Sequence, residues 1–243
     1  MKLKIVKEQE KISNDWSVEK VATEYPPNTW ENVFESAKDE IKDVSDILEK
    51  DNGRRVPDNI DLFRIFNLVP IHKVKVVILG QDPYLNILPN GKPQATGMCF
   101  SVPREASIPP SLKNIYKELK TNYPNFNPPK HGSLEKWCIQ GVFLLNACLT
   151  TRQGVSGAHG EIWTGFIKKV INAILDVNPK TIFVLWGKQA QKMKKIIGER
   201  ATCLEASHPS PLGAYRGFFG CGHFKQINEI LIENGSEPID WNL

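Results

Sequence analysis

Hydrophobic positions along the chain form four short apolar runs, separated by longer segments with helical periodicity. The clearest run is Val74–Leu79, VKVVIL, which has too little polar alternation for a strand with one face in water. Three further runs resemble it, at residues 141–145, 181–185 and 202–206. The pattern predicts strands that are buried on both faces of a parallel sheet.

The segments around these runs place apolar residues at the spacing of amphipathic helices. Residues 30–48 have this spacing and end before Asn52-Gly53, a usual helix stop. Residues 59–69 form a second, shorter amphipathic stretch, and Pro109-Pro110-Ser111 starts a predicted helix over 111–119. Residues 163–175 and 188–197 are also helical in pattern. This alternation favours an α/β fold with helices on both faces of the sheet.

The length of 243 residues is within the range of a single α/β domain. Residues 1–25 are polar and of mixed charge, and Trp16 is the only large anchor among them. We interpret them as a loosely attached lead-in with one helix. Residues 26–243 are expected to form one domain.

Composition narrows the class of protein. Hydrophobic residues make up 41% and charged residues 24%, as in ordinary globular proteins, and no apolar run is long enough to span a bilayer. The N-terminus lacks the features of a secretory signal, so an intracellular protein is expected, in the cytoplasm or nucleus. The five cysteines are scattered without CxxC spacing, which favours a reduced, metal-free protein. A net charge of +4 permits a polyanionic partner without requiring one.

Polar residues follow three of the four predicted strands. Asp82, Asn146 and His208 come just after or at the ends of the first, second and fourth runs. Each alone has an ordinary structural interpretation, as a turn-former before proline, a cap and a hydrogen-bonded loop residue. Carboxyl ends of parallel strands meet at one edge of a sheet, however, and ligands bind there. The convergence indicates an α/β enzyme with a polar site.

Longer motifs are more specific, and on them the chain resembles the common single-domain family of uracil-DNA glycosylases. The resemblance runs from about residue 30 to the C-terminus in the family's order. The matching motifs are GQDPY at 80–84, GMCFSV at 97–102, PPSLKNIYKEL at 109–119, GVFLLNACLT at 141–150, WGKQAQ at 186–191, HPSPLGAYRGFFGCGHF at 208–224 and IDWNL at 239–243. The resemblance implies a three-layer α/β/α sandwich with a central four-stranded parallel sheet. It also implies hydrolysis of the N-glycosidic bond of uracil in DNA, without a metal or cofactor.

The resemblance assigns catalytic roles to the strand-end residues. Asp82 resembles the carboxylate that orients the attacking water and stabilises the cationic sugar, as carboxylates do in glycoside hydrolysis. His208 resembles the donor to uracil O2, where negative charge develops. Asn146 matches the amide that pairs with N3–H and O4 of uracil and mismatches cytosine.

Further residues match the family's base pocket and its DNA-binding loops. Tyr84 resembles the wall that excludes the methyl group of thymine. Phe100 resembles the ring that stacks on the flipped base, although a core aromatic residue is its ordinary interpretation. Gln81 is expected to meet the base through its backbone. The DNA-binding matches are Pro110, Ser111, His159, Ser210, the apolar wedge Leu212, Tyr215 and Arg216. Ser111 and Ser210 suit helix or turn caps equally well.

The chain departs from the family after Tyr84, where histidine is usual and Leu85 stands here. The segment 85–96 is also longer than usual. We expect its apolar start to fold against the protein, which leaves residues 90–92 as an exposed turn with Lys92 near the DNA backbone. A basic helix face is interpreted as solvated; it consists of Lys188, Lys192, Lys194 and Lys195.

Three functional hypotheses remain open at this point. The first is an active uracil-excising enzyme, a monomer that acts on single- or double-stranded uracil-containing DNA and can bind a proteinaceous uracil-DNA glycosylase inhibitor. The second is a catalytically weakened member retained as a DNA-binding scaffold, motivated by Leu85 and the long loop. The third, a nucleotide-binding protein, is disfavoured because neither GxGxxG nor GxxxxGK[ST] is present.

Overall fold

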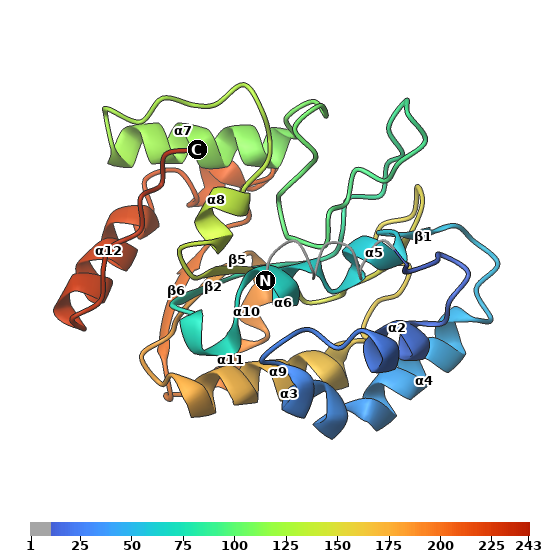
Figure 1. Cartoon of the computed structure of the whole chain (residues 1–243). Helices are drawn as coiled ribbons and strands as arrows, with labels where there is room; N and C mark the ends of the chain where they lie inside the picture. The colour runs from blue at the N-terminus through green and yellow to red at the C-terminus, as the bar shows by residue number, and fades with distance from the viewer. Residues whose placement is uncertain (1–10) are drawn as a thin grey trace.

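The computed structural model describes residues 11–243, which are arranged around one parallel β-sheet (Figure 1). Four strands form this sheet, and two short strands form a separate antiparallel pair. The parallel strands are β2 (Val76–Gly80), β3 (Val142–Asn146), β5 (Ile182–Trp186) and β6 (Thr202–Ala206). The antiparallel pair is β1 (Arg55–Val56) and β4 (Thr151–Arg152).

The helices precede, connect and follow these strands. Those before β2 are α2 (Val18–Glu24), α3 (Glu31–Ser36), α4 (Lys38–Leu48), α5 (Asn59–Leu62), α6 (Arg64–Leu68) and the 3₁₀ turn η1 (Ile71–Lys73). Those after it are α7 (Pro110–Asn122), α8 (Glu135–Cys138), α9 (Thr164–Val177), α10 (Lys188–Gln191), α11 (Lys194–Ile197), the 3₁₀ turn η2 (Ala214–Arg216) and α12 (His223–Glu233).

The strand order of the parallel sheet is β3-β2-β5-β6, and every neighbouring pair is parallel. The chain therefore leaves β2 toward β3 on one side and later crosses to β5 on the other. This reversal occurs beside β2, and crevices that bind ligands lie outside the carboxyl ends of the strands at such a point.

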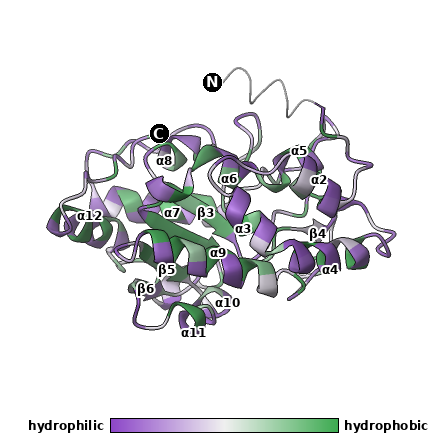
Figure 2. Cartoon of the chain, turned by 60° about the horizontal axis from the view of Figure 1, so that its bottom comes forward, coloured by the Kyte–Doolittle hydropathy of each residue, from purple (hydrophilic) through white to green (hydrophobic). Residues whose placement is uncertain are grey.

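Helices cover both faces of the sheet, so the molecule has three layers (Figure 1). On one face, Trp30 and Phe66 pack against Phe143 of β3, with ring centroids 5.1 and 5.2 Å away. On the other face, Phe218 and Phe224 pack against Trp186 of β5, at 5.1 and 5.9 Å. Figure 2 shows the strands as a hydrophobic centre surrounded by helices of mixed hydropathy. Burial on both faces explains the apolar runs of β2, β3 and β5. The same prediction is wrong for β6, which lies at the edge of the sheet and is buried only at Ala206.

The predicted four-stranded parallel sheet and its flanking helices are confirmed. Two of the longer segments that were predicted as single helices are each divided into two helices. The segment 30–48 bends at Ala37, which is fully buried between α3 and α4, and the segment 188–197 divides into α10 and α11. The spacing of apolar residues identifies the buried face of such a segment. It does not reveal a break in the helix when the same face stays buried on both sides of the break.

The described part of the N-terminal lead-in is packed against the domain. Val18, Val21 and Ala22 of α2 belong to the hydrophobic core. The buried Asn59 side chain also donates hydrogen bonds to the carbonyl of Ser13 at 2.8 Å and to that of Trp16 at 2.9 Å. The expectation of a loosely attached segment is therefore wrong for residues 13–22, while residues 1–10 lie outside the described residues.

Candidate active site

A cavity of about 620 Å³ opens at the carboxyl edge of the sheet, beside the end of β2. The structure brings the three strand-end residues Asp82, Asn146 and His208 together in its lining. Gln81, Tyr84, Phe100, Ser111 and Ser210, which were also predicted as site residues, line it as well.

Close approach of β2 and β3 shapes the floor of this cavity. Gly80 ends β2 opposite Asn146, which ends β3. A Cβ atom at position 80 would lie 2.4 Å from Oδ1 of Asn146 and 2.5 Å from Cβ of Cys99. Glycine at position 80 therefore leaves the space that the Asn146 amide occupies.

A second glycine lets His208 reach the cavity from the edge strand. His208 follows β6, and the chain passes close to Gly187 at the end of β5. Gly187 has a φ of +89°, and a Cβ atom there would lie 2.9 Å from Cβ of His208. A larger residue would push the histidine segment away from the cavity.

The Asp82 carboxylate is held from one side only. Its Oδ2 accepts a hydrogen bond from the backbone N–H of Gly157 at 2.9 Å and one from Oγ of Ser156 at 3.2 Å. Within residues 11–243, no hydrogen-bond donor contacts Oδ1. One carboxylate oxygen is thereby engaged, and the other is free to accept a hydrogen bond from a bound molecule.

The hydrogen bonds of His208 indicate its tautomer. Nδ1 of His208 accepts the backbone N–H of Ser210 at 3.0 Å, so in the neutral ring the proton is on Nε2. Burial lowers the pKa of His208, and the nearby Asp82 carboxylate opposes this shift. At neutral pH the ring is therefore uncharged and presents Nε2–H as a donor.

Two aromatic residues narrow the cavity. The hydroxyl of Tyr84 donates to the carbonyl of Phe100 at 3.4 Å, and burial raises the pKa of Tyr84. The ring of Phe100 lies 5.8 Å from those of His208 and Trp186. Phe100 also has a φ of +62°, which is uncommon for a residue other than glycine. A strained backbone conformation of this kind persists only where surrounding contacts hold the residue in place, as they often do at functional sites.

Other predicted DNA-binding residues surround the cavity. Pro110 and Ser111 are the first two residues of α7, and Pro109 is its N-cap. Pro110 is exposed, and Ser111 lines the cavity. Leu212 is 84% exposed and Tyr215 is 79% exposed, far more than most large apolar side chains of the protein. Arg216 is also exposed.

The loop that carries Leu212 is tied to the neighbouring helix. Nδ2 of Asn114 in α7 donates to the carbonyl of Pro209 at 2.7 Å. Oγ of Ser207 donates to the carbonyl of Arg216 at 2.8 Å. These bonds hold both ends of the loop, so Leu212 projects from a supported backbone.

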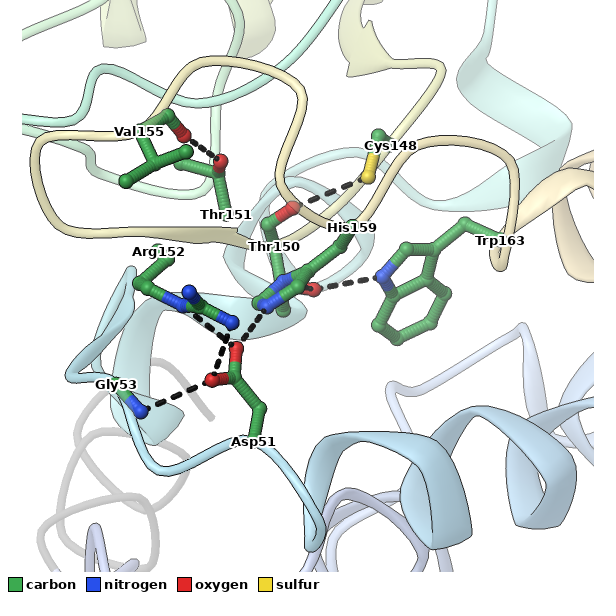
Figure 3. A network of polar contacts seen from close by, with 9 residues as sticks. All are labelled: Asp51, Gly53, Cys148, Thr150, Thr151, Arg152, Val155, His159 and Trp163. Atoms are coloured by element: carbon green, nitrogen blue, oxygen red, sulfur yellow. Dashed lines mark hydrogen bonds and ion pairs between the residues drawn. The ribbon is translucent and has the colours of Figure 1, made fainter.

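His159 lies away from the cavity, in the network shown in Figure 3. Its side chain is 5% exposed, and its Nε2 lies 2.8 Å from Oδ2 of Asp51. Its Nδ1 lies 2.9 Å from Oγ1 of Thr150, which also accepts Nε1–H of Trp163 at 2.8 Å. Both ring nitrogens are occupied, so the structure does not present this predicted DNA-binding side chain to a ligand.

The unusual segment after Tyr84 forms a hairpin. Ile87 and Pro93 form an antiparallel bridge, and the backbone N–H of Leu88 donates to the carbonyl of Lys92 at 2.8 Å. Leu85, Ile87 and Leu88 are half-buried, while residues 89–92 are exposed, as the sequence predicted. The carbonyl of Leu85 accepts the N–H of Gly154 at 2.9 Å, which joins the hairpin to the turn that holds Asp82.

Sequence reasoning missed Ser156 and Gly157. The glycines at 154 and 157 signal a turn, but nothing in the sequence connects that turn to a carboxylate 74 residues earlier. Only the tertiary fold places the two segments beside each other.

Within residues 11–243, no three His, Cys, Asp or Glu side chains are grouped so as to hold a metal ion. No helix of that part of the chain is long and apolar enough to cross a membrane.

Comparisons with known proteins agree with one another. A family model described as the uracil DNA glycosylase superfamily matches residues 66–232. A uracil-DNA glycosylase of Klebsiella pneumoniae is 45% identical over 224 residues, which cover 88% of this chain and 95% of the relative. One of Buchnera aphidicola is 44% identical over 221 residues, covering 88% and 98%.

Solved structures give the same result. The crystal structure of mimivirus uracil-DNA glycosylase superposes with a TM-score of 0.83 at 34% identity, covering 88% of this chain and 86% of that one. A variant of the mimivirus protein in complex with UGI superposes equally well. The chain therefore belongs to the uracil-DNA glycosylase family, whose members hydrolyse the N-glycosidic bond of uracil in DNA during base excision repair.

Proposed function

We propose that this enzyme excises uracil in the cavity beside β2, with Asp82 and His208 as its catalytic residues. The observation that carries the proposal is that, within residues 11–243, one cavity holds a carboxylate with an unpaired oxygen and a neutral imidazole with a free N–H donor. The Oδ1 atom of Asp82 is free to meet a positively charged sugar or its attacking water. His208 is neutral and offers Nε2–H to an oxygen that becomes negative.

In the proposed reaction, the bond between the sugar C1′ and uracil N1 breaks first. The electron pair leaves with the base, and the hydrogen bond from His208 stabilises charge on uracil O2. The sugar becomes oxocarbenium-like, and the Asp82 carboxylate stabilises it and orients a water toward C1′. The water oxygen then bonds to C1′ and releases one proton, and the uracil anion takes up one proton, so the products are an abasic site and neutral uracil.

Base recognition is assigned to the other residues of the cavity. Asn146 is 6% exposed and has both a donor and an acceptor, which match N3–H and O4 of uracil. In this proposal, Tyr84 excludes a methyl group at C5 of the base, and Phe100 stacks on the base. Gln81 contributes backbone contacts at the cavity edge.

The DNA itself is proposed to lie across the exposed residues around the cavity. Extrusion of a base from a duplex costs a few kcal/mol, and Leu212 fills the space that the base leaves. The backbone contacts are assigned to Pro110, Ser111, Ser210, Tyr215 and Arg216. We propose that the enzyme acts as an intracellular monomer, in the cytoplasm or nucleus, on single- and double-stranded DNA. We also propose that a proteinaceous inhibitor such as the UGI bound to the mimivirus variant binds it.

Asp82→Asn tests the proposed role of the carboxylate. We expect most turnover to be lost while binding of uracil-containing DNA is largely retained, because the charge acts on the transition state. Release of free uracil and the dissociation constant, both with EDTA present, measure the two effects. Normal turnover of the variant would refute the assignment, and a wild-type protein inactive on every uracil substrate would favour a DNA-binding scaffold.

A further inference from the structure

The turn at residues 154–157 contacts Asp82 through two donors that belong to no predicted site. Oγ of Ser156 and the backbone N–H of Gly157 both donate to the same carboxylate oxygen, Oδ2. Ser156 is exposed on the cavity side and lines the cavity. A side chain at this position can therefore act on Asp82 without disturbing the core.

A carboxylate on a short side chain turns easily about its terminal bond, because that torsion has broad minima. Two donors on one oxygen remove this freedom and hold the plane of the group. With Oδ2 held, Oδ1 keeps one direction toward the cavity. Groups held in the productive orientation lower the barrier because less freedom is lost in the transition state.

The turn itself is fixed on three sides. The N–H of Gly154 donates to the carbonyl of Leu85 at 2.9 Å. Oγ1 of Thr151 donates to the carbonyl of Val155 at 2.8 Å, as Figure 3 shows. Immediately after it, His159 is held between Asp51 and Thr150. Ser156 is therefore presented to Asp82 from a fixed backbone and not from a free loop.

We infer that Ser156 is a positioning residue for uracil excision, which fixes the orientation of the Asp82 carboxylate through its hydroxyl. The inference rests on the proposed catalytic role of Asp82. Leu85, which accepts the N–H of Gly154 from this turn, has no hydrogen-bonding side chain and contributes only its carbonyl. The hydroxyl of Ser156 is then the one side-chain donor within residues 11–243 that contacts Asp82.

A double-mutant cycle tests the inference. We expect Ser156→Ala to lower the single-turnover rate of uracil release about tenfold, because one hydrogen bond to a charged group is lost. The affinity for a single-stranded uracil-containing oligonucleotide should stay within about twofold of the wild type. Ser156→Thr, which keeps the hydroxyl, should restore most of the rate. Ser36→Ala, at an exposed serine that ends α3 and does not line the cavity, serves as the matched control.

The cycle is completed in the Asp82→Asn background, where Ser156→Ala should have almost no further effect. A wild-type rate for Ser156→Ala, or the same tenfold loss in both backgrounds, would overturn the inference. A loss of affinity in place of rate would also overturn it, since it would make Ser156 a direct DNA contact. Full activity of Asp82→Asn alone would instead refute the proposed role of Asp82, so the two failures are distinguishable.

Discussion

At the scale of single residues, we propose that Asn146 determines which pyrimidine fits the pocket. It is 6% exposed, and the missing side chain of Gly80 leaves room for its amide. A buried amide cannot reorganise freely, and a wrong partner would leave its donor or acceptor unpaired. Such a mismatch costs on the order of 1–3 kcal/mol or more, which is enough to discriminate between bases.

Asn146→Asp is expected to admit cytosine at a low rate and to slow uracil release. The carboxylate has only acceptors when ionised, which match the exocyclic amine of cytosine and oppose O4 of uracil. Release of free cytosine and free uracil from matched oligonucleotides measures the change. Asn172→Asp, at a half-buried asparagine of α9 that does not line the cavity, is the control. If the variant released no cytosine above background, Asn146 would not contact the base.

At the scale of elements, two loops carry exposed residues that we propose to contact DNA. The 207–217 loop presents Leu212 from a backbone held by Asn114 and by Ser207. The 85–96 hairpin presents Lys92 at its tip, where Nη2 of Arg54 donates to the carbonyl of Gly91 at 2.8 Å. One substitution in each loop tests these proposed contacts.

Leu212→Ala is expected to slow uracil release from duplex DNA about tenfold, because burial of a leucine side chain contributes about 1.5–3 kcal/mol. Release from single-stranded DNA should change little, since no stack has to be refilled. Single-turnover rates on the two substrates give the comparison. Equal losses on both substrates would contradict the assignment of Leu212 as a wedge.

Lys92→Ala is expected to reduce the salt dependence of DNA affinity. One lost phosphate contact lowers the slope of log K against log salt concentration by about 0.9 for duplex DNA. Binding titrations at several salt concentrations give the slope. Lys168→Ala, an exposed lysine of α9, is the matched control. An unchanged slope for Lys92→Ala would mean that the hairpin tip lies away from the DNA.

At the scale of the whole molecule, the network around Asp51 connects the end of α4 to the segment that carries the Asp82 turn (Figure 3). A hydrogen bond from His159 is the main cause that lowers the pKa of Asp51 to about 2, with further bonds from Gly53 and Arg152. The folded state therefore binds the proton of Asp51 less readily than the unfolded chain, whose value is about 4.

This depressed pKa predicts a stability contribution that is present above pH ~4 and lost as the pH falls toward ~2. Asp51→Asn should lower the free energy of unfolding by about 1–2 kcal/mol at pH 7, and by less as the pH approaches 2. Urea denaturation across this pH range measures the difference. Asp46→Asn removes an exposed ion pair with Lys42 and should have little effect. A difference independent of pH would exclude the ionised carboxylate as its source.

The sequence by itself determined the α/β class, the four sheet strands and the polar residues at their ends. Strands buried on both faces must be apolar throughout, so the runs that became β2, β3 and β5 are visible without a structure. The motifs around Asp82 and His208 were enough to indicate the family. Parallel strands place their carboxyl ends at one edge, which made the convergence of these residues predictable.

Only the tertiary structure decided which neighbours each site residue has. Ser156 meets Asp82 across 74 residues of sequence, and His159 is buried beside Asp51 across 108 residues. Local periodicity contains no information on such contacts, because they arise from how loops pack after the sheet has formed. The bend at Ala37 was invisible for a related reason: it turns the chain while keeping the same apolar face against the core.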